Sequence, residues 1–270
     1  MSGLIKKLKP ALWAKGLTAN AKNAFSKCTF WVKILFMLNE YLKATKDIFL
    51  PSLCFYCEKK TNNGYLCSAC KDKIEFLYPP LCRFCSNPIA NNKSGLCKEC
   101  FGKTFPYERL ICITSYKEPI ISLIHFFKYR NYDCLANLLS SFMIEHLLKI
   151  GFSYSYYDTV TSVPMHSAKL RDRGYNQSAL LAKSFANYFK IAFKNDIIYE
   201  LRQRVSQTRL DITKRQENIR GIFYVKENMA GVKIILIDDI FTTGATAKEC
   251  AYALKEKGAI VTVIALSKTQ

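Results

Sequence analysis

The chain has 270 residues, with 40 lysines and arginines against 21 acidic residues, and it contains twelve cysteines. Half of the residues are hydrophobic, which excludes disorder along most of the chain and leaves enough sequence for one or two buried cores. The formal net charge of +19 favours anionic partners: nucleic acid, phosphate-bearing small molecules or an acidic membrane surface. Twelve cysteines in a chain of this length, without a clear cleavable signal, favour a cytosolic metal site over a secreted disulfide scaffold.

The N-terminal segment, residues 1–50, is predicted to be a basic helical leader. Residues 1–53 carry nine lysines against two acidic residues. Their hydrophobic run, residues 30–38, is interrupted by Lys33 and is far shorter than the roughly 20 apolar residues that a membrane-spanning helix needs. Apolar residues recur at helical spacing over residues 24–50, which indicates an amphipathic helix. This helix either packs on the body of the protein or lies on an anionic membrane or on DNA.

Eight of the twelve cysteines form four pairs with a two-residue spacer. A spacer of this length lets a tight turn direct both thiolates at one ion, and two such turns supply the four sulfur ligands that zinc prefers. The similar gaps between the pairs indicate an internal duplication, so residues 51–105 are predicted to form a double zinc ribbon with two structural Zn²⁺ ions. The expected ligands are Cys54, Cys57, Cys67 and Cys70 for the first ion, and Cys82, Cys85, Cys97 and Cys100 for the second.

Three alternatives to this pairing are a crossed arrangement in which the first and third pairs share an ion, an iron–sulfur cluster, and disulfides. A closed site of four thiolates stabilises a small fold and leaves no open coordination position for catalysis. The two zinc sites are therefore predicted to stabilise the fold and not to take part in catalysis. The isolated cysteines are expected to be small core residues: Cys28, Cys112, Cys134 and Cys250.

The remainder of the chain, residues 106–270, alternates strand-like with helix-like segments. Strands are expected at residues 108–116, 158–163, 197–201, 222–225, 232–237 and 259–266. Helices are expected at residues 120–128, 132–150, 177–189 and 244–257. This alternation predicts an α/β fold with a mainly parallel sheet flanked by helices, in which ligands bind at the carboxyl ends of the strands.

The most specific motif in this part of the chain spans residues 234–246. Asp238 and Asp239 follow an apolar run and can accept hydrogen bonds from vicinal sugar hydroxyls, or reach a metal through water. Gly244 permits a turn that wraps backbone N–H groups around an anion, and the helix after it directs its positive end at a phosphate. Further hydroxyl donors are Thr242, Thr243 and Thr246. The chain has no glycine-rich P-loop ending in Gly-Lys-Ser/Thr, which counts against a P-loop enzyme.

Residues 234–246 closely resemble the 5-phosphoribosyl-1-pyrophosphate (PRPP) motif of type I phosphoribosyltransferases. Further segments narrow the resemblance to the ComF-type competence proteins. Residues 163–166 and 171–178 look like that family's Val-Pro-x-His and Arg-x-Arg-Gly-Tyr-Asn-Gln block. Residues 204–223 are similar to its arginine-rich segment, and residues 121–129 resemble its lysine motif. With the cysteine ribbon in front, the resemblance covers about residues 51–267.

The resemblance implies a phosphoribosyltransferase-like domain over residues 106–270. In such a domain Asp238 and Asp239 hold the ribose hydroxyls and are the catalytic candidates, and residues 242–246 hold the 5-phosphate. The turn after Val163 and Pro164 lies near the pyrophosphate, with Mg²⁺ bridging ligand oxygens. The full set that the resemblance assigns to PRPP is Asp238, Asp239, Thr242, Thr243, Gly244, Ala245, Thr246, Val163, Pro164, Lys128, Arg171 and Arg173. Purine-salvage members have an aspartate where this chain has Thr242, so purine salvage loses support.

The sequence is compatible with three functions, two of them implied by the resemblance and one by the cysteine ribbon. ComF-type proteins are required for natural transformation in several bacteria and are thought to act where single-stranded DNA enters the cytoplasm. This role implies a cytoplasmic protein with at most peripheral contact with the inner face of the cytoplasmic membrane. The alternative is an active phosphoribosyltransferase with an unidentified acceptor, because no reaction is generally agreed for the family. A third function makes the ribbon a docking module for a helicase or a DNA-uptake channel.

Basic residues cluster in sequence around the predicted phosphate site. Guanidinium groups beside aromatic rings fit a groove that follows single-stranded DNA, and they fit pyrophosphate equally well. The cluster consists of Lys169, Arg171, Arg173, Arg202, Arg204, Arg209, Lys214, Arg215 and Arg220.

Overall fold

The computed structural model describes residues 53–61, 64–90, 93–130, 132–200 and 221–269. The helix predicted over residues 24–50 lies outside these ranges, as does the part of the basic cluster within residues 202–220. The described parts of Leu53–Lys59 and Gly64–Gln270 form one compact unit. No helix in the described part of the chain is long and apolar enough to cross a lipid bilayer.

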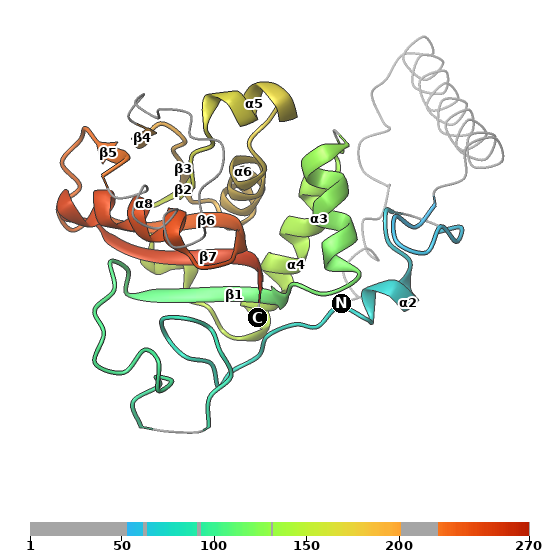
Figure 1. Cartoon of the computed structure of the whole chain (residues 1–270), viewed down its shortest axis with the longest axis horizontal. Helices are drawn as coiled ribbons and strands as arrows, with labels where there is room; N and C mark the ends of the chain where they lie inside the picture. The colour runs from blue at the N-terminus through green and yellow to red at the C-terminus, as the bar shows by residue number, and fades with distance from the viewer. Residues whose placement is uncertain (1–52, 62–63, 91–92, 131, 201–220, 270) are drawn as a thin grey trace, which may run out of the picture. The chain divides into compact units, whose positions relative to one another are not determined.

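Five parallel strands form the central sheet, in the order β1, β7, β6, β2, β3 (Figure 1). Their bounds are β1 Arg109–Ser115, β7 Ile260–Lys268, β6 Lys233–Phe241, β2 Thr159–Ser162 and β3 Ala192–Phe193. A separate antiparallel pair consists of β4 (Ile198–Glu200) and β5 (Phe223–Val225). The prediction of an α/β fold with a mainly parallel sheet is confirmed.

Helices cover both faces of the sheet. On one face lie α3 (Ile120–Tyr129), α4 (Leu135–Lys149) and α6 (Gln177–Phe189), and on the other lies α8 (Ala245–Glu256). Strand β6 shows how the two cores are filled, because Ile235 and Ile237 enter the core of the first three helices. Ile234 and Leu236 enter the core of α8. A strand that is buried on both faces must be apolar at every position, which explains its unbroken hydrophobic run.

Strand β6 continues further than its sequence predicted. The expected end was residue 237, but the ladder to β7 runs on through Asp238 opposite Ala265 to Phe241 opposite Lys268. The two aspartates therefore lie within the strand and not after it. Aspartate has a low strand propensity, so the sequence predicted that the strand ends before Asp238. Backbone pairing with the long neighbour β7 outweighs this propensity.

Four short elements in the described part of the chain were not predicted. They are α2 (Ser68–Lys71), the 3₁₀ helix η1 (Tyr154–Tyr156), α5 (Ser167–Arg173) and the two-residue strand β3. Helix α5 buries none of its residues, so it has no apolar periodicity that sequence reasoning could detect. It begins after His166, whose Nδ1 accepts the Ala168 N–H at 3.2 Å, and it ends at Gly174 in the left-handed conformation.

Hydrogen bonds join the second ribbon to strand β1. The Ser86 hydroxyl donates to the Leu110 carbonyl at 2.9 Å and accepts the Cys112 N–H at 3.1 Å. The Tyr107 hydroxyl donates to the Phe84 carbonyl at 2.9 Å, and the rings of Phe84 and Phe105 stack 4.5 Å apart. The fold of this ribbon is therefore coupled to the edge of the sheet.

The first ribbon packs on the helices. The ring of Phe55 meets those of Phe126 and Tyr132 edge to face, at 5.1 and 4.9 Å between centroids. A salt bridge of 3.3 Å joins Lys71 to Glu145 of α4. Both partners of this salt bridge are about half exposed, so the aromatic contacts contribute most of the stabilisation.

Candidate functional site

The carboxyl ends of β6 and β2 bring together the residues of the predicted sugar-phosphate site. The two strands pair in parallel with Ser162 opposite Ile237, so Val163, the residue after β2, follows on beside Asp238 of β6. The Val163 N–H donates to the Ile237 carbonyl at 3.0 Å, and Pro164 follows, half-buried. In parallel sheets ligands bind at this edge.

Lys128 of α3 reaches this edge and pairs with Asp239. Its Nζ lies 2.7 Å from Asp239 Oδ2, and each side chain is less than one-sixth exposed. The other carboxylate oxygen of Asp239 accepts the Ile240 N–H at 2.6 Å. Sequence reasoning placed both residues at the site, whereas their contact depends on the packing of α3 on the sheet.

Asp238 lies in a different environment. Burial first, and then the neighbouring charge of Asp239, raise the pKa of Asp238 to about 7, and no cation pairs with it among the described residues. The Ser178 hydroxyl donates to its Oδ1 at 3.2 Å, and the Asp239 N–H donates to the same oxygen at 2.9 Å. At neutral pH the pair therefore contains a carboxyl group that readily holds a proton beside an ion-paired carboxylate.

This charge state bears on Mg²⁺. Asp238 is partly neutral and Asp239 is already compensated by Lys128, so the pair offers little free negative charge to a metal. Mg²⁺ prefers oxygen ligands and commonly binds through substrate phosphates together with one or two carboxylates. The residues therefore fit Mg²⁺ that arrives bound to phosphate oxygens better than a resident Mg²⁺ held by protein alone.

The turn between β6 and α8 has the features of an anion-binding loop. Gly244 adopts a φ of 70°, and a Cβ at this position would overlap the buried ring of Phe241. Thr243 is exposed, and its hydroxyl accepts the Ala245 N–H at 3.3 Å. Thr242 is exposed and Thr246 is half-buried in the first turn of α8, where unpaired N–H groups and the helix dipole attract anions.

Helix α5 and the start of α6 lie beside the site. Arg171 is exposed, and Arg173 donates to Gln177 Oε1 and to the Tyr129 hydroxyl, both at 3.3 Å. Asn176 caps α6 and also donates to the Val163 carbonyl at 3.0 Å. Sequence reasoning gave no role to Asn176 or to Ser178, although both lie in the segment that carries the family resemblance.

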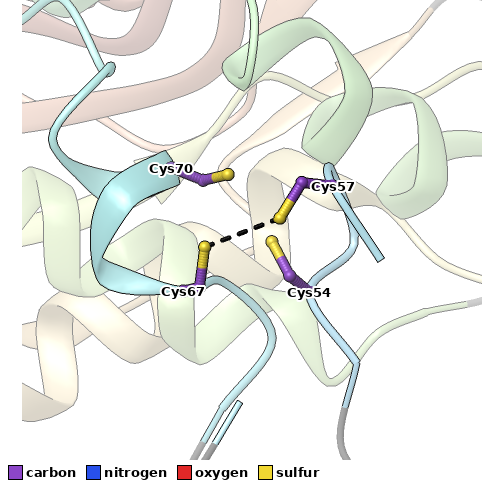
Figure 2. A group of neighbouring side chains, drawn as sticks. All are labelled: Cys54, Cys57, Cys67 and Cys70. Atoms are coloured by element: carbon purple, nitrogen blue, oxygen red, sulfur yellow. Dashed lines mark hydrogen bonds between the residues drawn. The ribbon is translucent and has the colours of Figure 1, made fainter. Parts of the chain in front are cut away.

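The first group of cysteines forms a compact cluster (Figure 2). The sulfur atoms of Cys54, Cys57, Cys67 and Cys70 all lie within 4.8 Å of one another. The Sγ atoms of Cys57 and Cys67 are 3.6 Å apart, close to the ~3.8 Å expected for sulfurs at the corners of a tetrahedron around zinc. The donors and their spacing fit Zn²⁺.

The second group repeats the first in detail. Cys82, Cys85, Cys97 and Cys100 likewise lie within 4.8 Å of one another, and the Sγ atoms of Cys85 and Cys97 are 3.5 Å apart. Glu58 and Ser86, each directly after the second cysteine of its turn, share a left-handed φ of 57° and 54°. The structure thus pairs neighbouring turns, as the sequence predicted, and not in the crossed order.

Backbone N–H groups stabilise a thiolate in each group. Burial raises the pKa of Cys54, but the N–H groups of Cys57, Cys67 and Tyr56 outweigh it and lower the pKa to about 6. In the same way, burial of Cys82 is outweighed by the N–H groups of Cys97, Phe84 and Cys85, and the pKa of Cys82 falls to about 7. Zinc binds the thiolate, so this polarity favours metal binding.

The isolated cysteines lie elsewhere. Cys112 and Cys250 are fully buried in the core beneath α8, and Cys134 is half-buried beside Tyr65. Cys28 lies outside the described residues.

Comparison with known proteins agrees with both parts of this chain. A family model described as a double zinc ribbon domain matches residues 45–101. The "DNA utilization protein YhgH" of Salmonella typhimurium is 29% identical over 214 residues, which cover 78% of this chain and 93% of that protein. "Competence protein F" of Haemophilus influenzae is 25% identical and covers 76% and 91%, and "Competence protein ComFC" of Bacillus subtilis is 27% identical and covers 73% and 81%. The chain is thus similar to proteins named for DNA utilization and competence over about three-quarters of its length, which agrees with the resemblance to the ComF family. The double zinc ribbon that the sequence predicted is matched by a family model, and it precedes the α/β fold described above.

Solved structures give weaker matches. Adenine phosphoribosyltransferase from Leishmania tarentolae is 12% identical with a TM-score of 0.32, covering 52% of this chain and 73% of that one. Phosphoribosylpyrophosphate synthetase from Mycobacterium smegmatis is 19% identical with a TM-score of 0.29, and the match spans 50% of this chain and 33% of the synthetase.

The buried pair of Lys128 and Asp239 predicts a measurable loss of stability. In a Lys128→Met variant the Asp239 carboxylate stays buried without its cation, so we expect the free energy of unfolding to fall by about 3 kcal/mol. Urea denaturation at pH 7.5 measures this change. The double variant Lys128→Met/Asp239→Asn removes both charges and should recover most of the loss. A single variant as stable as the wild type would contradict the pairing.

Proposed function

We propose that this protein binds PRPP, or a related sugar phosphate with Mg²⁺, and also binds single-stranded DNA during uptake of transforming DNA. The observation that supports this proposal most strongly is the arrangement at the ends of β6 and β2. Two carboxyl groups lie near the edge of the sheet where ligands bind, a phosphate-type turn follows at Gly244, and Lys128 supplies a cation. Each feature suits a different part of a phosphorylated ribose.

The proposed binding divides among the residues as follows. Asp238 and Asp239 accept hydrogen bonds from the ribose hydroxyls, and the turn at residues 242–246 donates backbone N–H groups to the 5-phosphate. Lys128 and the segment after Val163 lie where the pyrophosphate would be, with Arg171 on the exposed side. Mg²⁺ would neutralise the pyrophosphate when it is bound.

Three observations support the binding of single-stranded DNA. The net charge of +19 attracts polyanions along the whole chain. Two relatives, each matched over more than nine-tenths of its own length, are named "DNA utilization protein YhgH" and "Competence protein F". Two exposed arginines lie on elements that contribute to the site: Arg130 directly after α3, and Arg171 on α5. We further propose that the protein acts at the inner face of the cytoplasmic membrane, where a transforming strand enters.

The test compares the wild type with the Asp238→Asn/Asp239→Asn variant in two binding assays. Calorimetry with PRPP and Mg²⁺ should show binding by the wild type and a loss of at least about 100-fold in the variant, because both sugar-hydroxyl acceptors are altered. Fluorescence anisotropy should show micromolar or tighter binding of a single-stranded oligonucleotide by the wild type. This affinity should fall about tenfold or more between 50 and 200 mM salt.

A matched control is Asp158→Asn, which changes an aspartate directly before β2 at the opposite edge of the same sheet, where Asp158 Oδ2 accepts the Lys233 N–H. This variant should bind both ligands as the wild type does. Unchanged PRPP binding by the double variant would overturn the pocket assignment. Absence of binding to single-stranded DNA at low salt would overturn the DNA half of the proposal.

A phosphoribosyl transfer reaction is the second candidate, and the environment of Asp238 favours it. A carboxyl group with a pKa raised to about 7 beside a compensated carboxylate is an arrangement that enzymes use for proton transfer near neutral pH. Release of pyrophosphate from PRPP, measured with a panel of nucleobase and amine acceptors, tests this candidate. If the protein binds PRPP but releases no pyrophosphate with any acceptor, it binds PRPP without transferring the phosphoribosyl group.

A further inference from the structure

An exposed aromatic and basic surface lies beside the proposed pocket, at the end of α3. Tyr129, the last residue of the helix, is 60% exposed although it follows directly after Lys128, which reaches Asp239. Two planar groups, the Arg173 guanidinium and the His125 imidazole, lie close to its ring. The Arg173 guanidinium lies over it at 5.0 Å from the ring centroid, and the His125 ring lies 5.0 Å away on the previous turn of α3.

The surface is held in place from below. The Tyr175 hydroxyl donates to the Phe127 carbonyl at 2.6 Å, and Gln177 donates to the same carbonyl at 3.4 Å. Arg173 is fixed by its bonds to Gln177 and to the Tyr129 hydroxyl. An exposed tyrosine with a stacked guanidinium is thus presented on a rigid base, and its conformational entropy is already reduced before any ligand binds.

The chemistry of this surface fits a nucleobase better than a protein partner. A tyrosine ring and a guanidinium plane both stack on bases of any sequence, and neighbouring cations attract the strand's phosphates. The cations here are Arg130 at the exposed end of α3 and Arg171 on α5. A base on Tyr129 would place the adjoining sugar-phosphate unit near the pocket, since the preceding residue, Lys128, is the one that pairs with Asp239.

We infer that Tyr129, with Arg173 and His125, forms a base-stacking platform for single-stranded DNA at the rim of the sugar-phosphate pocket. This inference rests on the proposed function, because it requires that the protein binds single strands. Beyond the proposed function, it assigns to Tyr129 the role of stacking on a base of the strand.

The experiment measures binding by the full-length protein of a labelled oligothymidylate of about 20 nucleotides, and of an abasic strand of equal length and charge. Tyr129→Ala should weaken binding of the oligothymidylate about 5- to 100-fold, because stacking on one base is lost. Tyr129→Phe keeps the stacking ring and should stay within about twofold of the wild type. Tyr188→Ala, which removes a tyrosine that is 56% exposed on α6, should have no effect.

The abasic strand separates stacking from charge. Wild type and Tyr129→Ala should bind it equally, since it has phosphates and no bases to stack. An equal loss on both strands would overturn the platform, and so would a Tyr129→Ala variant that binds the oligothymidylate as well as the wild type does. The latter result would leave DNA binding intact and assign the exposed tyrosine to another partner. If the wild type binds neither strand, the proposed DNA function fails together with the platform.

Discussion

Loss of the second zinc site is expected to destabilise the α/β domain as well as the ribbon. A Cys82→Ala/Cys85→Ala variant should retain one equivalent of zinc. Its free energy of unfolding should be lower than that of the wild type by at least about 5 kcal/mol, because a structural zinc site contributes folding free energy directly. The effect reaches the sheet through Ser86, which bonds to both Leu110 and Cys112 of strand β1. Zinc content by mass spectrometry and urea denaturation followed by circular dichroism measure both changes.

The first zinc site offers a matched comparison. Cys54→Ala/Cys57→Ala should also remove one equivalent of zinc. Its ribbon packs on the helices through side chains such as Phe55, and the segment after Cys70 bonds to β1 through the Ser115 N–H, which donates to the Glu75 carbonyl at 2.9 Å. We therefore expect the α/β domain to lose stability in this variant as well. Cys134→Ala, which changes a cysteine outside both groups, should retain both zinc equivalents. Full zinc content in either double variant would contradict the assignment of these thiolates.

Long regular elements could be predicted from the sequence, because local pattern and tertiary burial agree in them. The helix expected at residues 177–189 is α6 with the same bounds, and α3 and β1 differ from their predictions by at most a residue or two. The paired cysteine groups were also predictable, since a two-residue spacer and similar gaps restrict which turns can share an ion. The same reasoning failed for α5, whose seven residues have no buried face.

The contacts of the candidate site were less predictable than its residues. The motif at residues 234–246 indicated two carboxylates, a turn and a helix start, and the structure places these together. It could not show that Lys128 pairs with Asp239 or that Ser178 bonds to Asp238, because α3 and α6 reach the strand only through the fold. Nor could it show that Arg173, expected at the pocket, is stacked on Tyr129. Such pairs depend on tertiary packing, which one sequence does not encode locally.

Asp238 is expected to destabilise the free protein at neutral pH. Its pKa is raised from an ordinary value near 4 to about 7 by burial and by Asp239. The folded protein therefore holds a proton that the unfolded chain releases at lower pH. By linkage, the contribution of this group to stability is greatest below about pH 4, falls as the pH rises toward 7, and is constant above that.

An Asp238→Asn variant removes this titration and keeps an oxygen that can accept the Ser178 and Asp239 hydrogen bonds. Its gain in stability over the wild type should therefore grow with pH, by about 1.4 kcal/mol per unit between pH 5 and 7, up to about 4 kcal/mol at pH 8. Urea denaturation at several pH values without ligand measures this gain. Asp239→Asn is the matched control and should be destabilising, because it leaves Lys128 without its counter-ion. A gain that is absent at pH 8, or equal at pH 5 and 8, would refute the raised pKa. A stabilising Asp238→Asn variant that also loses PRPP binding would show that the aspartate is retained for its ligand at a cost to the stability of the free protein.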